Sequence, residues 1–152
     1  MPALHDDELD VDTRLARRLV ESSLPHLAGL SLRPLPSSGS SNVLFRLGEE
    51  LLVRLPRQRG GTATIEKEAR WLPVVAQALT TAVPEVVAVG DPGYGYPERW
   101  SVTTWLDGQV PVVPWDVNDG SSERLAIGLA HVVLELRQLG VPAVADLSLI
   151  HI

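Results

Sequence analysis

The chain has 152 residues, a net charge of −6 and no cysteine. Its length is that of one ordinary domain, and its 45% hydrophobic content is typical of a globular protein. The acidic balance argues against a nucleic-acid-binding surface, the lack of Lys/Arg runs and of long apolar runs argues against a membrane protein, and the lack of cysteine excludes disulfides and thiolate metal sites.

The first segment, residues 1–10, is acidic and polar. It lacks the basic start and apolar stretch of a signal peptide, so we expect a cytoplasmic protein. Asp10 or Asp12 could cap a helix that reaches about Leu27, with an apolar face around Leu19. A strand over roughly 30–35 should follow, closed by a proline.

Two strands of a hairpin are predicted next, over Val43–Leu47 and Leu51–Leu55. Gly48 supplies the flexible backbone that the turn between them needs. Because side chains alternate across a strand, Val53 should point to one face of the sheet and Arg54 to the other.

The helix predicted over about Ala63–Leu79 is the most readable element. Thr62 or Thr64 could cap it. Its apolar stripe at helical spacing consists of Ile65, Ala69, Leu72, Ala76 and Leu79. Glu68 falls within this stripe, and a carboxylate on the packing side of a helix is costly unless it is paired.

Two more strands are predicted, over Val83–Val89 and Trp100–Trp105. The composition shift over Gly108–Gly120 marks the best candidate for a boundary between lobes. A final helix over about 121–139 could be capped by Ser121 or Ser122. These elements predict an α+β fold, with a mostly antiparallel sheet of about five strands, one packed helix and a flanking N-terminal helix.

A small polar loop, Ser37–Asn42, precedes the hairpin. Backbone N–H groups of such a Ser/Gly/Asn loop can face phosphate oxygens, but an ordinary hairpin loop explains the same residues. It is neither a Walker loop nor a dinucleotide-binding fingerprint.

Arg54 and Glu68 form the second candidate feature. They would meet if the helix lies over the sheet, and such a pair can hold a cation against nucleotide phosphates. A purely structural ion pair, or two independent solvated charges, are the alternatives. Side chains on opposite sides of the sheet would end the nucleotide hypothesis.

The end of the last strand, Thr104–Gly108, could offer backbone groups to a flat ring, or could simply be a core strand that runs into a linker. No serine lies in a G-x-S-x-G elbow, which argues against a hydrolase nucleophile. The histidines show no metal-ligand spacing, so a metal site is not expected. They are His5, His26, His131 and His151.

Taken in order, these segments resemble the aminoglycoside phosphotransferase family, whose fold is protein-kinase-like. The most characteristic run covers residues 38–47 and 50–56, and the match continues through 66–73, 83–86 and 105–108. Each motif is short, but their order and spacing are fairly specific. The resemblance covers roughly residues 25–140.

The resemblance implies a role for each candidate residue. The loop would cover the ATP phosphates, Arg54 would contact them and Glu68 would orient Arg54. The backbone of Thr104 and Leu106 would contact adenine. The complete set implied to bind the cofactor is Ser38, Gly39, Ser40, Asn42, Arg54, Glu68, Thr104 and Leu106.

The resemblance also implies a domain organisation. Residues 1–108 would form the nucleotide-binding N-terminal lobe, and 109–146 the linker and first helix of a truncated helical lobe. The last six residues, 147–152, match the in-frame translation of a transposon end used in sequencing adapters, so we expect them to carry no biology and the chain to be cut before its natural end.

The family's catalytic loop, of the form His-Gly-Asp…Asn, does not occur in this sequence. The intact enzyme would transfer the γ-phosphoryl group of ATP, with Mg²⁺, to a hydroxyl of a small molecule such as an aminoglycoside. Phosphoryl transfer needs a base and metal-binding acidic groups, so we expect this chain alone to be inactive, with no catalytic or metal-ligating residues. The alternatives are a non-catalytic nucleotide-binding or interaction module and a small structural domain.

Overall fold

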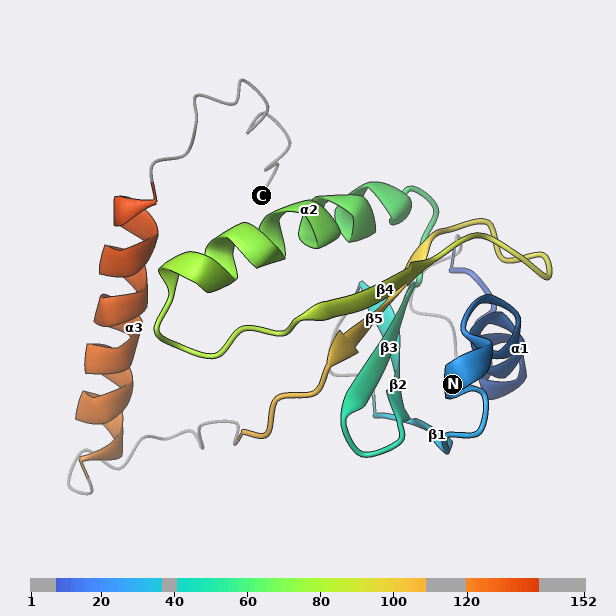
Figure 1. Cartoon of the computed structure of the whole chain (residues 1–152), viewed down its shortest axis with the longest axis horizontal. Coiled ribbons are helices and arrows are strands. Elements are labelled where there is room, and N and C mark those ends of the chain that lie inside the picture. The colour runs from blue at the N-terminus through green and yellow to red at the C-terminus, as the bar shows by residue number, and fades with distance from the viewer. Residues whose placement is uncertain (1–7, 37–40, 109–119, 140–152) are drawn as a thin grey trace. The chain divides into compact units, whose positions relative to one another are not determined.

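The computed structural model describes residues 8–36, 41–108 and 120–139. It has two compact units: residues 1–74 with 83–108, and residues 75–82 with 109–152. The first unit contains a five-stranded antiparallel sheet with the strand order β1-β2-β3-β5-β4 (Figure 1). This confirms the predicted α+β fold and its mostly antiparallel sheet.

Helix α1 spans Thr13–Ser23. Asp12 caps it by accepting a hydrogen bond from the N–H of Leu15 at 2.7 Å, so the second of the two predicted caps is the one used. The helix ends earlier than predicted, because Pro25 begins a separate 3₁₀ turn, Pro25–Leu27. A proline disfavours helical backbone at the residue before it, which accounts for the early end.

Strands β1 (Leu32–Pro34), β2 (Asn42–Leu47) and β3 (Leu51–Pro56) form one side of the sheet. Gly48 has a φ of 60° in the β2–β3 turn, where it fulfils the role predicted for it. Phe45 pairs with Val53 across the hairpin, and both are buried. The predicted alternation is therefore correct: Val53 and Leu55 face the buried side, and Leu52 and Arg54 face the other.

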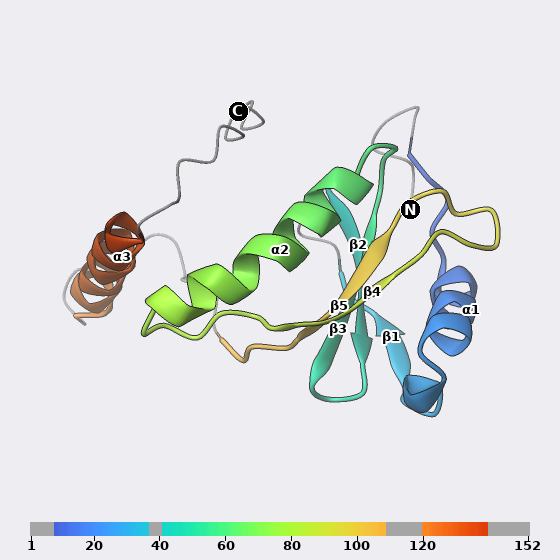
Figure 2. The same ribbon diagram turned by 45° about the horizontal axis from the view of Figure 1, so that its top comes forward.

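The apolar face of the sheet packs against α1 (Figure 2). Its core is formed by fully buried side chains from α1, the hairpin and β5, together with Tyr96. The largest of these are Trp100, Phe45, Leu19, Leu47 and Leu55. Burial of aromatic and branched side chains from both layers is what fixes α1 on this face.

Helix α2 (Thr62–Ala78) lies on the opposite face of the sheet from α1 in both views (Figures 1 and 2). Only Ile65 of this helix is fully buried. Ala76 of the predicted stripe is exposed, so the stripe buries less than its periodicity suggests. Helix α2 also begins at Thr62, which makes this threonine its first residue and not its cap.

Strands β4 (Val86–Gly90) and β5 (Trp100–Thr104) complete the sheet. β5 pairs with β3, so Ser101 lies opposite Arg54 and Thr103 opposite Leu52. A register irregularity between Val86 and Ala88 interrupts the β4–β5 ladder. The predicted strand over 83–89 is shorter at its start than expected.

In the second unit, α3 spans Ser121–Gln138. Gly120, with a φ of 68°, precedes it and makes no side-chain cap, so the predicted serine cap is wrong. Glu135 accepts hydrogen bonds from the hydroxyl of Thr80 at 2.6 Å and from its N–H at 3.1 Å. These hydrogen bonds lower the pKa of Glu135. Among the described residues, no helix is both long and apolar enough to cross a bilayer.

Candidate functional site

Arg54 of β3 and Glu68 of α2 form a two-armed ion pair on the polar face of the sheet. Nη2 of Arg54 donates to Oε1 of Glu68 at 3.0 Å, and Nη1 donates to Oε2. The side chains remain 21% and 30% exposed, so solvent or a ligand can still reach the charges. The predicted contact is confirmed, while its role toward a nucleotide stays a prediction.

The polar face around this pair carries the alternate residues of the hairpin and β5. Leu44 lies opposite Arg54 on β2, and Asn42, two residues earlier on the same strand, shares this face. On β5, Ser101 is buried opposite Arg54, and its hydroxyl has no hydrogen-bond partner among the residues described. Arg54 and Asn42 thus belong to one surface.

A shallow depression of about 280 Å³ lies at the β1–β2 side of the sheet. Its lining residues are Arg33, Pro34, Leu35, Arg46 and Trp105. The guanidinium carbon of Arg46 lies 3.9 Å from the centroid of the Trp105 ring. This is a cation–π contact, and it presents a flat stacked surface to the depression.

Sequence reasoning missed both Arg46 and Trp105 as site residues. Arg46 pairs with Leu52, two positions from Arg54 on β3, so both arginines lie on the same face. The register of the hairpin therefore predicts that Arg46 lies on the same face as Arg54. Its Nε is buried without a partner among the residues described, and Nη2 donates to the carbonyl of Glu49.

The residues predicted to contact adenine lie at the end of β5. The hydroxyl of Thr104 accepts from the N–H of Glu85 at 2.9 Å, and its N–H donates to the Glu85 carbonyl at 2.9 Å. Leu106 is 41% exposed. Both residues flank Trp105. The backbone N–H of Trp105 donates to the Glu50 carbonyl at 2.7 Å, so this segment is anchored beside the depression.

Three residues of the predicted phosphate loop, Ser38, Gly39 and Ser40, lie outside the described residues. Asn42 is described and begins β2. Its carbonyl accepts from Nε of Arg57 at 3.2 Å, and Arg57 also forms an ion pair with Glu8. The C-terminal end of the loop is thereby held to β3.

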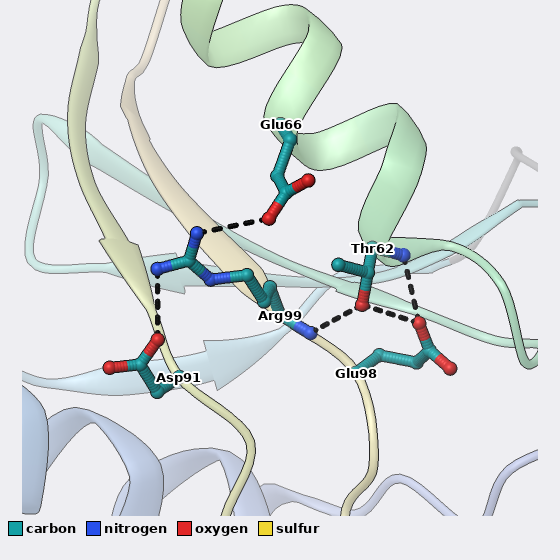
Figure 3. Close-up of polar contacts among 5 residues, drawn as sticks. All are labelled: Thr62, Glu66, Asp91, Glu98 and Arg99. Carbon is teal, nitrogen blue, oxygen red and sulfur yellow. Dashed lines mark hydrogen bonds and ion pairs between the residues drawn. The ribbon is translucent and has the colours of Figure 1, made fainter.

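The first turn of α2 is attached to the segment that precedes β5 (Figure 3). Glu98 accepts from the N–H of Thr62 at 2.8 Å and from its hydroxyl at 2.6 Å. Burial alone would raise the pKa of Glu98, but hydrogen bonds from Thr62 and Gly60, with the charge of Arg59, together lower it. Glu98 is therefore held as a carboxylate although it is only 6% exposed. Sequence reasoning did not identify it.

No group of three or more acidic or histidine side chains within the described ranges is placed to hold a metal ion. The described part of the chain therefore offers a cation and a stacked surface for an anionic, flat ligand, without a cluster of three or more metal-binding side chains.

The chain is similar to known proteins both in its sequence family and in its fold. A model of the phosphotransferase enzyme family matches residues 31–150. No curated protein sequence matches the chain significantly. Among solved structures, the GDP complex of aminoglycoside 2'-phosphotransferase-IIIa superposes with a TM-score of 0.73 at 20% identity, over 85% of this chain and 43% of that one.

Two further structures give the same picture. The streptomycin–ATP ternary complex of APH(2")-IIa has a TM-score of 0.61 at 16% identity, over 88% of this chain and 42% of that one. ADP-bound APH(2'')-Ib has a TM-score of 0.62 at 19% identity, over 85% and 40%. The chain thus spans less than half the length of these proteins, and its sheet and helices match their kinase-like N-terminal lobe. The chain belongs to the phosphotransferase enzyme family.

Proposed function

We propose that this chain is the nucleotide-binding part of an ATP-dependent small-molecule phosphotransferase. The whole enzyme would transfer the γ-phosphoryl group of ATP to a hydroxyl of a molecule such as an aminoglycoside, in the cytoplasm. The observation that carries the proposal is the Arg54–Glu68 pair, which holds a partly exposed cation on the polar face of the sheet. Family membership and neighbours named as GDP, ATP and ADP complexes support it.

The residues present fit a nucleotide. Arg54 would contact the phosphates while Glu68 holds its guanidinium in place. Trp105 and Arg46 offer a stacked surface for the base, and the backbone of Thr104 and Leu106 would also contact it, Thr104 through its carbonyl because its N–H donates to Glu85. Backbone N–H groups of the loop containing Ser38, Gly39, Ser40 and Asn42 would cover the phosphates.

ATP, when bound, supplies the phosphoryl group and its leaving group, and the chain supplies position and charge. Arginine presents a planar fork that can contact two phosphate oxygens at once. Its pairing with Glu68 reduces the freedom of a long side chain before the ligand arrives, so less conformational entropy is lost on binding. Mg²⁺ is usually held by one or two carboxylates together with the phosphates of the nucleotide, and the described residues contain no cluster of three or more candidate metal ligands.

We propose that this chain binds nucleotide without transferring phosphate. The His-Gly-Asp loop is absent from the sequence, and the solved relatives are more than twice as long as the part that matches. A non-catalytic nucleotide-binding module would show the same behaviour, and the genomic sequence beyond the last codon separates the two. Continuation into a His-Gly-Asp loop favours the enzyme.

Calorimetric titration with ATP tests the binding proposal. Arg54→Met should weaken ATP binding at least about tenfold, the equivalent of about 1.4 kcal/mol. Arg14→Met removes the same charge from an exposed position on α1, on the other face of the sheet, and should change the affinity less than twofold. Equal affinity of the two variants, or no ATP binding by the unmodified chain, would refute the proposal.

A turnover assay tests the inactivity of the chain. We expect no phosphorylated product when the purified 152-residue chain is incubated with ATP, Mg²⁺ and a panel of hydroxylated antibiotics. Product above the background of a chain-free control would show that the residues present suffice for catalysis.

A further inference from the structure

The start of α2 cannot cap itself. The residue before it is Gly61, which has no side chain, so it cannot satisfy the free N–H groups of the first turn. A Cβ at this position would lie 2.2 Å from Cβ of Pro56, so no capping side chain fits there. The cap must come from elsewhere in the fold.

Glu98 provides that cap from the segment just before β5. Its carboxylate accepts from three donors: the N–H of Gly60 at 3.0 Å, and the N–H and hydroxyl of Thr62. The N–H of Arg99 in turn donates to the Thr62 hydroxyl at 2.9 Å (Figure 3). Charged acceptors with several donors make the strong class of hydrogen bonds, and this one is buried.

The side chain of Arg99 forms two weaker ion pairs near the first turn of α2. Its guanidinium contacts Glu66 at 3.1 Å and Asp91 at 2.8 Å, as Figure 3 shows. These carboxylates are 53% and 79% exposed, so solvent screens both pairs. Glu98 is therefore the contact that sets the position of the first turn of α2.

The position of that turn decides where Glu68 lies. From Thr62 to Glu68 the helix rises about 9 Å. Glu98 lies two residues before β5, and Ser101 of that strand lies opposite Arg54. Helix α2 is thus connected to the sheet at two places: Thr62 contacts Glu98 at the entry to β5, and Glu68 contacts Arg54 on β3.

Packing alone fixes α2 weakly. Helix α1 buries three side chains completely over 11 residues, whereas α2 buries only Ile65 over 17. A helix with so little apolar burial can slide or rotate at small cost. Polar contacts at the first turn of α2 then contribute strongly to the position of the helix on the sheet.

We propose that Glu98 is a positioning residue for the Arg54–Glu68 pair. By holding the first turn of α2 to the start of β5, its carboxylate keeps Glu68 within reach of the Arg54 guanidinium. Its effect on the ion pair can be measured without a ligand, and its consequence for ATP binding rests on the proposed function.

A double-mutant cycle measures the ion pair directly. Arg54→Met, Glu68→Gln and the double variant are compared by denaturant unfolding, once in the unmodified chain and once with Glu98→Gln. The coupling between Arg54 and Glu68 should fall by at least half in the Glu98→Gln background. A purely structural cap would lower the stability of all four chains equally and leave the coupling intact, which would overturn the proposal.

Glu66→Gln is the matched control background. It removes a carboxylate one helical turn after Thr62 without touching the Glu98 contacts, so the coupling should stay within error of the unmodified value. If Glu98→Gln prevents folding, Thr62→Val removes the hydroxyl, which donates to Glu98 and accepts from the N–H of Arg99. The backbone N–H groups of Gly60 and Thr62 still donate to Glu98, so a smaller loss of coupling is expected. An equal loss of coupling with Glu66→Gln would also overturn the assignment to Glu98.

ATP affinity gives a second, separable readout. Glu98→Gln should weaken ATP binding by about the same factor as Glu68→Gln, and the double variant should lose no more than either alone. If ATP does not bind the unmodified chain, the proposed function fails, while the cycle still decides the role of Glu98. Full additivity of the two losses would show that Glu98 acts on binding by another route, and would overturn the inference.

Discussion

The two faces of the sheet in the first unit are built from neighbouring residues of the same strands but serve different purposes. On one face, Val53 and Leu55 are fully buried under α1. On the other, Arg54 lies between them in sequence and remains partly exposed beside α2. Strand alternation alone separates the apolar face, which α1 covers and which we call the closed face, from the polar face, which we call the open face because it remains partly exposed.

The difference shows where stability and ligand chemistry reside. The closed face gains its free energy from apolar area removed from water, which needs no particular ligand. The open face contains the Arg54–Glu68 pair, the stacked pair formed by Arg46 and Trp105, and the shallow depression that Arg33 and Arg46 line. Variants of the first face should therefore change folding, and variants of the second should change binding.

Trp100→Ala should give the largest effect on stability. The Trp100 side chain is fully buried on the closed face, and its Nε1 donates to the carbonyl of Asp91. Truncation leaves a cavity, with an expected loss of about 3–5 kcal/mol in the free energy of unfolding. Trp105→Ala, on the open side, is the control and should cost far less. Equal losses by denaturant unfolding would contradict the comparison of faces.

Glu98→Gln should come next, with a loss of about 2 kcal/mol at neutral pH, because the buried hydrogen bonds to a charged acceptor are weakened. The effect should depend on pH. The pKa of Glu98 is lower in the folded chain, so its contribution is complete above the ordinary glutamate pKa of about 4.3 and is lost as pH falls through the folded value.

The unfolding free energy of Glu98→Gln should therefore fall less steeply with acid than that of the unmodified chain. The groups that act on this carboxylate are Thr62, Gly60 and Arg59. Burial raises the pKa of Tyr96, and the charge of Glu98 raises it further. Tyr96 does not titrate in acid, because its pKa is raised, so it does not contribute to this slope. Parallel pH profiles for the two chains would contradict the assignment.

Arg54→Met should cost only about 1 kcal/mol, because both members of the ion pair are partly solvated and water can take over the exposed carboxylate. Arg54→Lys keeps the charge but loses the two-armed geometry, so it should restore part of the stability and less of the ATP affinity. Thermal unfolding and titration of the three chains check this split. A loss as large as that of Trp100→Ala would place Arg54 in the core.

Local patterns predicted much of this structure. The cap at Asp12, the hairpin turn at Gly48 and the alternation around Arg54 all depend on residues close in sequence. The contact between Arg54 and Glu68 could also be predicted, because a carboxylate in an apolar stripe needs a partner nearby.

Contacts between distant segments were missed. Glu98 caps Thr62 across 36 residues, and no short motif signals a cap supplied from so far along the chain. The stacking of Arg46 on Trp105 likewise depends on where β5 ends relative to the hairpin. The serine cap predicted for α3 failed for a local reason, since Gly120 precedes the helix and provides none.

The smallest effect is expected for Arg33→Ala, at the outer strand of the open face. Arg33 pairs with Glu49 at 2.9 Å, but the two side chains are 60% and 80% exposed. Solvent and salt screen such a pair, so the free energy of unfolding should change by less than about 0.5 kcal/mol. Arg33 also lines the depression, so the same variant should weaken ATP binding measurably while leaving stability unchanged. A variant that alters binding without altering folding is what the division between the two faces requires, and the reverse result would contradict that division.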